Sequence, residues 1–232
     1  MKFDEYQADL AAVPLFRGIA PEDLRALMAC FSPAVKSVQK GEIAVTAGDP
    51  LRSIGIVLRG AVEIAHESAA GGKSLLAQAD AGSTFGEIAA FAGRDTWPST
   101  VTARADSLLL FVPPERFLGN CPKACGFHRV LIQNMLRILA DKALRLNRKV
   151  EYLELKGIRQ KLCAYLLEQR GLNGSDAFIL PMNKSELADY LHVSRPSMSR
   201  ELGLLRDEGA LDFYLSSIRL LDVDTLQKAA SQ

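Results

Sequence analysis

Residues that could recognise nucleic acid gather around position 195, where arginine and serine side chains are interspersed with apolar ones. Arginine can donate two hydrogen bonds to O6 and N7 of guanine, and serine can bond to bases or to phosphates. These side chains suit hydrogen-bonded recognition of DNA rather than catalysis. The candidate DNA-binding residues are Lys184, Ser194, Arg195, Ser197, Ser199 and Arg200.

A second candidate group combines two thiols and an imidazole. In a helix, Cys121, Cys125 and His128 would lie on one face, because they are spaced i, i+4 and i+7. Such ligands could bind a transition metal, and the thiols could respond to oxidants. Pro122 and Gly126 weaken a helix here, and cysteines are common core residues, so a packing role is the alternative. The three residues are therefore candidates for a metal or redox site.

No pattern in the sequence points to an enzyme: it shows no nucleophile–base pair, metal triad or phosphate-binding loop. Four cysteines in 232 residues do not form a disulfide framework. There is no signal peptide and no apolar run near the length of a membrane span, so we expect a cytoplasmic protein without a membrane partner. Residues 1–125 carry 12 basic and 14 acidic side chains, and residues 126–232 carry 16 and 13, which suits a C-terminal half that meets polyanions.

The elements that would present the arginines and serines form a helix-turn-helix. Residues 183–191 have the pattern of a short helix, and after a tight turn Ser194 is a good N-cap for a second helix with Pro196 in its first turn. Two short strands between Leu211 and Leu221 follow as a wing. The N-terminal part of such a second helix enters the major groove of DNA, which favours DNA binding over a helical hairpin in an ordinary core. The expected core residues are Leu187, Ala188, Leu191, Val193, Met198 and Leu202.

A long helix is predicted over residues 126–155, because apolar residues repeat there with alternating three- and four-residue spacing. Thirty residues span about 45 Å, which is long for a core helix. The alternative is a buried helix between two domains, but the heptad spacing favours a seam between two chains. Gly157 is expected to end the helix in a left-handed conformation. The expected dimer-interface residues are Ile132, Leu136, Leu139, Ala143, Leu146, Val150 and Leu153.

Residues 1–125 combine two helices with many short strands. Pro21 suits the first turn of the second helix. From Val35 the apolar period changes to two, and glycine corners such as Gly60 separate the strands, which predicts an antiparallel barrel or roll. No strand is followed by a crossover helix, which argues against a parallel nucleotide-binding sheet. The predicted fold class is α+β, with domains over residues 1–125, 126–155 and 156–232.

The order of several short motifs resembles the Crp–Fnr family of transcription regulators. The motifs are Lys40-Gly41-Glu42, Gly48-Asp49, Gly60, Phe85-Gly86-Glu87, and Ser-Arg-x-Ser-x-Ser-Arg at 194–200 followed by Leu-x-x-Glu-Gly. The resemblance implies a jelly-roll-like antiparallel β-roll as sensor domain, a long dimerisation helix and a winged helix-turn-helix domain. It also implies a homodimer that binds palindromic half-sites of double-stranded DNA, with RNA polymerase as a partner. Activation and repression are both left open.

The same resemblance implies where an effector would bind. In nucleotide-binding members, Phe-Gly-Glu starts a short helix that meets the ribose and phosphate, and an arginine about ten residues later grips the phosphate. Here Trp97-Pro98 stands at that place, and Arg94 lies three residues early. Because a buried phosphate needs a cationic partner, the sequence argues against cyclic AMP. The candidate effector-pocket residues are Phe85, Gly86, Glu87, Ile88, Trp97, Ser99 and Thr100.

The effector itself stays open. Some family members hold haem between the roll and the long helix, and the axial ligands here would come from His66, His128 or Met135. Cys30 is the only cysteine before residue 121, which argues against the iron–sulfur cluster of the oxygen-sensing branch. The missing arginine and the thiols near the long helix favour a redox or nitric oxide signal at the junction of roll and helix. The alternatives are a cyclic-nucleotide-responsive regulator and a sensor module that acts through protein contacts.

The resemblance also carries a departure in the second helix. Many members have a glutamate where this chain has Pro196, and that glutamate accepts a hydrogen bond from a cytosine amino group. Proline cannot do so, and we therefore expect a half-site that differs at the corresponding base pair.

Overall fold

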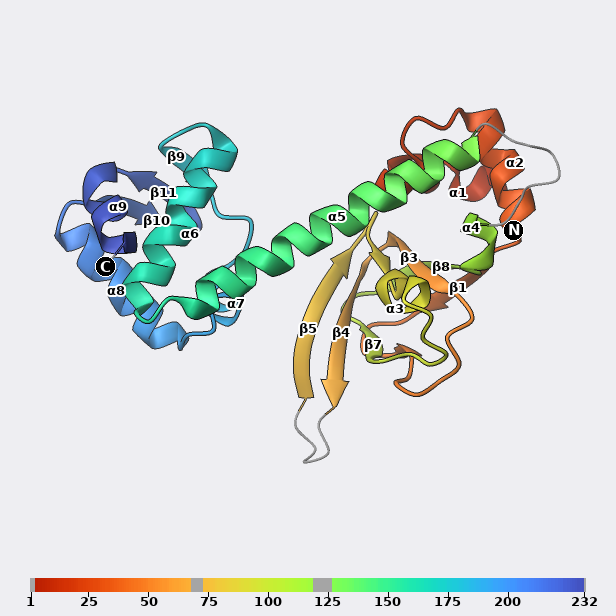
Figure 1. The fold of residues 1–232 in the computed structure, drawn as a ribbon, viewed down its shortest axis with the longest axis horizontal. Helices are drawn as coiled ribbons and strands as arrows, with labels where there is room; N and C mark the ends of the chain where they lie inside the picture. The colour runs from red at the N-terminus through yellow and green to blue at the C-terminus, as the bar shows by residue number, and fades with distance from the viewer. Residues whose placement is uncertain (1–2, 68–72, 119–126, 232) are drawn as a thin grey trace. The chain divides into compact units, whose positions relative to one another are not determined.

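Two short helices precede the sheets, and their boundaries follow from local sequence. In the computed structural model, which describes residues 3–67, 73–118 and 127–231, α1 spans Phe3–Ala12, the 3-10 turn η1 spans Pro14–Phe16, and α2 spans Pro21–Phe31 (Figure 1). Pro21 occupies the first turn of α2 as expected, because its missing N–H has no intrahelical partner there. The buried face of α2 consists of Leu24, Leu27, Met28 and Phe31.

Two antiparallel four-stranded sheets form the roll. The first has the order β1 (Ala34–Val38), β8 (Ser107–Val112), β3 (Ile54–Arg59), β6 (Thr84–Phe85). The second has the order β2 (Ile43–Val45), β7 (Thr100–Ala103), β4 (Ala61–Glu67), β5 (Lys73–Asp80), and Figure 1 shows β4 and β5 as a long hairpin. Every pairing in the two sheets is antiparallel, which confirms the predicted roll.

Strand β3 is buried on both of its faces. Ile54, Ile56 and Leu58 pack in a core with α1, α2 and the start of the long helix. Val57 points into a second core that also contains Phe85 and Trp97. Alternation along β3 therefore separates two cores rather than a core from solvent.

Two short helices lie in the connections of the roll, and a long one follows it. They are α3 (Glu87–Phe91), α4 (Glu115–Leu118) and α5 (Phe127–Glu154). Figure 1 shows α5 as one uninterrupted helix, close to the predicted range. The residues divide by contacts into an N-terminal unit, 1–140, and a C-terminal unit, 141–232, with the boundary inside α5. The division into residues 1–125, 126–155 and 156–232 stays a prediction.

Each end of α5 is packed into its own unit. In the N-terminal unit, Leu131 and Met135 are buried, and the Asn134 amide donates to the carbonyl oxygens of Leu15 at 3.0 Å and Arg17 at 2.8 Å. In the C-terminal unit, Tyr152 is buried with its ring centroid 6.0 Å from that of Tyr165 and 5.8 Å from that of Tyr190. Its hydroxyl group donates to Glu168.

The C-terminal unit has the predicted winged helix-turn-helix. Its elements are α6 (Ile158–Asn173), β9 (Ala177–Ile179), α7 (Lys184–Tyr190), α8 (Arg195–Asp207), β10 (Leu211–Tyr214), β11 (Ser217–Leu220) and α9 (Val223–Ser231). The antiparallel sheet has the order β10-β11-β9. The expected core is present, with Val193 half-buried and the others buried. The α+β fold class is confirmed.

One of the two glycines that flank α6 differs from expectation. Gly157 is the N-cap of α6 with an extended backbone, φ −106°, so it does not end α5 in a left-handed turn. The side chain of Gln160 accepts a hydrogen bond from its N–H at 3.2 Å, which explains why an extended residue is favoured there. The left-handed residue is Gly174, which ends α6 after Asn173.

Candidate functional site

The second helix of the helix-turn-helix presents the predicted arginines and serines. Ser194 caps α8, because its Oγ accepts a hydrogen bond from the N–H of Ser197 at 3.2 Å. Burial of Met198, Leu202 and Leu205 fixes the opposite face of the helix in the core. The predicted residues divide by accessibility: Ser194, Arg195 and Arg200 are exposed, and Ser197 and Ser199 are half-buried.

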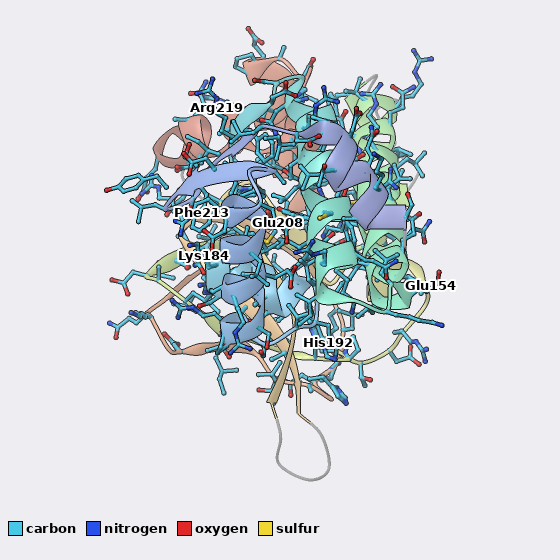
Figure 2. All side chains as sticks on the ribbon, turned by 90° about the vertical axis from the view of Figure 1, so that its left-hand side faces the viewer. Glu154, Lys184, His192, Glu208, Phe213 and Arg219 are labelled. Carbon is cyan, nitrogen blue, oxygen red and sulfur yellow. The ribbon has the colours of Figure 1, made fainter. Side chains whose placement is uncertain are left out.

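The first helix, α7, places Lys184 beside the wing. Asn183 forms a capping box: its side chain accepts from the N–H groups of Ser185 and Glu186, and Glu186 accepts from the N–H of Asn183 at 2.9 Å. Lys184 then begins the helix, and its Nζ lies 4.3 Å from the centroid of the Phe213 ring on β10 (Figure 2).

Arg206, in the last turn of α8, contacts the same ring with its Cζ 5.2 Å from the centroid. Both contacts are cation–π interactions, which hold cationic side chains in place without neutralising them. Sequence reasoning missed Arg206 and Phe213. Lys184, Arg206 and Phe213 are named below as the aromatic–cation cluster. Nothing in the sequence places them together, because the hairpin brings Phe213 to the other two.

The wing exposes further groups at its tip and edge. Tyr214 is 78% exposed, and Leu215 follows it with a positive φ of 53°, unusual for a γ-branched residue. Arg219 on β11 is exposed and pairs in register with Asp212 on β10. An exposed hairpin beside α8 is the arrangement of a winged helix-turn-helix.

The predicted seam residues lie mostly on an exposed face of α5. Leu136, Leu146, Val150 and Leu153 are large apolar residues that remain exposed in the single chain, and Ala143 is exposed as well. Ile132 and Leu139 are half-buried, and Leu139 packs partly against the core of its own roll. An apolar stripe of this length in water favours a partner.

Among the candidate effector-pocket residues, Trp97, the chain's only tryptophan, packs in a core with Phe85. Trp97 is 6% exposed, and its indole lies against Gly86 so closely that a Cβ on Gly86 would be 2.4 Å from two ring atoms. Its ring centroid is 6.0 Å from that of Phe85. Of the other candidate pocket residues, Glu87, Ser99 and Thr100 are buried. Ile88 is exposed.

The backbone holds Trp97 at this position. Its N–H donates to the carbonyl oxygen of Asp49, and its own carbonyl oxygen accepts from the N–H of Gly48, both at 2.9 Å. The Oγ1 of Thr100 accepts from the N–H of Ala47 at 3.2 Å, in the same loop. The indole is therefore a fixed part of the roll, and the turn at Gly86 is covered by an apolar ring.

The metal and redox candidates are only partly described. Cys121 and Cys125 lie outside the described residues. His128 is half-buried in the first turn of α5, and its ring centroid lies 5.1 Å from that of Phe127. Its Nδ1 has no hydrogen-bond partner among the described residues. In the described ranges, no three His, Cys, Asp or Glu side chains are grouped to hold a metal ion.

The haem-ligand candidates lie in different environments. His66 is exposed on β4, and Met135 is buried in the core of the N-terminal unit. Of the described cysteines, Cys30 is half-buried and Cys163 is buried. Burial raises the pKa of the Cys163 thiol to about 11, which keeps it protonated and unreactive near neutral pH. Over the described part of the chain, no helix is both long and apolar enough to cross a bilayer.

Comparisons with known proteins match both parts of the chain. A family model described as a cyclic nucleotide-binding domain matches residues 35–121, and one described as a Crp-like helix-turn-helix domain matches residues 160–229. The chain is 26% identical over 226 residues to a protein of Lacticaseibacillus casei described as the transcriptional regulator flp, covering 95% of this chain and 97% of that one.

Two further proteins are similar over most of their length. A Mycobacterium tuberculosis protein described as a CRP-like cAMP-activated global transcriptional regulator is 22% identical, covering 95% of this chain and 98% of its own. The solved structure of FixK2 from Bradyrhizobium japonicum matches with a TM-score of 0.55 at 20% identity, covering 85% of this chain and 96% of that one. At this identity, the structural match supports the fold alone.

Proposed function

Because the chain belongs to the Crp–Fnr family of transcription regulators, we propose that it acts as a homodimer and reads palindromic double-stranded DNA through the N-terminal half of α8. The observation that carries this proposal is the arrangement of α8. Its cap and buried face fix the helix, while Arg195 and Arg200 remain exposed to meet base edges.

Other cationic groups support DNA binding around α8. Lys184 and Arg206 of the aromatic–cation cluster keep their charge, and such groups suit contacts to phosphates, which set position rather than sequence. Pro196 is exposed in the first turn of α8, and its side chain has no hydrogen-bonding group. No carboxylate at this position can therefore read a base pair of the half-site. Such a regulator works on chromosomal DNA in the cytoplasm and acts on transcription through RNA polymerase.

Two chains would pair through the exposed face of α5. Pairing of two identical stripes buries the leucines and valine that one chain leaves exposed, and a two-fold axis between them gives a palindromic site. The two recognition helices then address half-sites about one turn of DNA apart.

The effector is proposed not to be a cyclic nucleotide. The Mycobacterium tuberculosis relative is named as cAMP-activated, but here an apolar indole covers the turn at Gly86, where the resemblance implies a phosphate. A phosphate without a donor-rich partner is costly to bury. A redox or nitric oxide signal, through thiols or haem, is the proposed alternative, and it must stabilise one orientation of the reader over another to act.

The test compares the wild type with Arg200→Ala. DNA selected by the wild-type protein from a random-sequence duplex library defines the site, and fluorescence anisotropy measures affinity at several salt concentrations. We expect Arg200→Ala to weaken binding to the selected site by about 10- to 100-fold, the value of one bidentate base contact. The exposed Arg94→Ala in the roll, as a control, should bind like the wild type.

Two outcomes would contradict the proposal. Equal binding by wild type and Arg200→Ala would remove α8 as the reader. Affinity that does not fall as salt rises would favour the alternative, a sensor module that acts through protein contacts, because phosphate contacts release counterions.

A further inference from the structure

Arg159 joins the recognition helix to the start of α6 through a three-way ion pair. Arg159 is the second residue of α6, directly after the segment that links α5 to α6. Its Nε donates to Glu201 Oε1 at 2.5 Å, and its Nη2 and Nη1 donate to the two oxygens of Glu208 at 2.6 and 3.0 Å. One guanidinium group thus binds two carboxylates of the region of α8, one of them in the bidentate geometry that favours arginine.

The two carboxylates lie on one flank of the recognition helix. Glu208 follows Glu201 by seven positions, which is about two turns or 10 Å along the axis. Glu201 directly follows Arg200, whereas Glu208 is the C-cap of α8 and is labelled in Figure 2. A contact at both places resists rotation of α8 about its own axis, and such a rotation would move Arg200 away from a base edge.

The contact is more than an ordinary surface ion pair. The side chain of Glu201 is 18% exposed and that of Arg159 is 36% exposed, so water screens this half of the contact only partly. Arg206, on the opposite flank of α8, contacts Phe213 of the wing. The helix is therefore held on both flanks by cationic side chains, and Arg195 and Arg200 take part in no side-chain hydrogen bond or ion pair among the described residues.

We propose that Arg159 is a positioning residue for sequence recognition: it sets the rotation of α8 and so the aim of Arg200, without touching DNA itself. The inference rests on the proposed function of α8 as a DNA reader. A purely structural ion pair would add stability but leave the choice of sequence unchanged. A positioning residue instead changes the ratio between the affinity for the cognate site and the affinity for a mutated site.

The experiment uses the full chain and measures discrimination. Wild type, Arg159→Gln and Arg159→Lys bind the wild-type-selected duplex and a duplex with one altered base pair in each half-site, at one salt concentration. The control is Arg170→Gln, which breaks a more exposed ion pair, 2.5 Å long, between Arg170 at the end of α6 and Asp176 after that helix. Unfolding in urea, followed by circular dichroism, measures the stability of each variant.

We expect Arg159→Gln to lower the ratio of cognate to altered-site affinity by about tenfold, comparable to one poorly formed base contact. Binding to the altered duplex should weaken less, because that duplex has already lost one base contact per half-site and its phosphate contacts are unchanged. Arg159→Lys keeps the positive charge but loses the two-pronged hydrogen bonding of the guanidinium group. Its affinity ratio should therefore lie between those of the wild type and Arg159→Gln. Arg170→Gln should keep the wild-type ratio.

The outcomes separate this inference from the proposed function. A wild-type ratio for Arg159→Gln, or a loss that Arg170→Gln matches, would overturn the positioning role. If Arg159→Gln does not fold, the double variant Glu201→Gln, Glu208→Gln removes the same contacts from the other side and is held to the same outcomes. A wild-type protein that selects no sequence at all would instead refute the DNA-reading function.

Discussion

Trp97 and Gly86 fit together only because glycine has no side chain. Gly86 has a positive φ of 81°, and the indole lies where a Cβ would point. The same turn leads into α3, so a bulkier residue there would disturb both the turn and the ring. The position of the indole thus depends on the absence of a side chain at residue 86.

Gly86→Ala should destabilise the N-terminal unit more than Gly93→Ala. Both glycines have positive φ, which costs alanine about 1–2 kcal/mol. Only Gly86 also meets the indole, and the added overpacking should cost about 1–3 kcal/mol more. At Gly93 an added Cβ would have nothing within 4 Å, so Gly93→Ala is a matched control. Urea unfolding followed by Trp97 fluorescence measures both.

A double variant identifies the cause. If the excess comes from the ring, the additional cost of Gly86→Ala should disappear in a Trp97→Ala background. Because Trp97 is the chain's only tryptophan, unfolding in this background is followed by circular dichroism. Equal destabilisation by Gly86→Ala and Gly93→Ala would show that the indole does not occupy the turn.

The two helices of the reader depend on their caps. Both α7 and α8 begin at a polar side chain that accepts backbone N–H groups, Asn183 and Ser194. Short helices are marginal by themselves, so packing of the buried faces stabilises them most, and each cap adds about 1 kcal/mol. The cap at Ser194 also fixes Arg195 as the first residue of α8.

Asn183→Ala should destabilise the C-terminal unit by about 1 kcal/mol, because two N–H groups at the start of α7 lose their acceptor. Asn183→Asp should keep nearly full stability, since aspartate caps helices equally well. Circular dichroism during urea unfolding reports the change. Equal loss in the alanine and aspartate variants would mean that the hydrogen bonds of Asn183 do not stabilise the helix.

The proposed dimer uses one face of α5, and residues near both ends of the helix pack within the chain. Leu131 and Met135 are buried in the N-terminal unit, and Tyr152 is buried in the C-terminal unit. The exposed part of the stripe, which contains Leu146, belongs to neither core, although Leu139 of the same stripe packs partly against the roll. This exposed part is the surface that is proposed to meet a second copy.

Leu146→Glu should dissociate the dimer, with a dissociation constant at least about 100-fold higher, because pairing would bury a carboxylate in an apolar seam. Leu144→Glu is the matched control: Leu144 and Leu146 are 63% and 62% exposed, but two residues turn the helix by about 200°, so Leu144 lies off the stripe. Analytical ultracentrifugation over a concentration series measures both. A dimer unaffected by Leu146→Glu, or disrupted equally by Leu144→Glu, would place the interface elsewhere.

The helix-turn-helix, the antiparallel roll and the long helix were predictable because each is encoded locally. A cap, a proline in the first turn and the spacing of apolar residues lie within about 20 residues for α7 and α8, and glycine corners mark the strands. The exposure of Arg200 follows from the same spacing, since helical periodicity places it on the face opposite Met198 and Leu202. Arg195 is exposed because it is the first residue of α8, directly after the cap.

Contacts between distant segments were decided by the tertiary structure. Glu201 and Glu208 meet Arg159 from 42 and 49 positions away, and Phe213 reaches Lys184 and Arg206 through a hairpin. The lack of an arginine at the position where the family resemblance implies one was visible in the sequence, but the indole against Gly86 was not. Local spacing determines which face of an element is apolar. It does not determine which other element covers that face, because this depends on how all the cores pack at once.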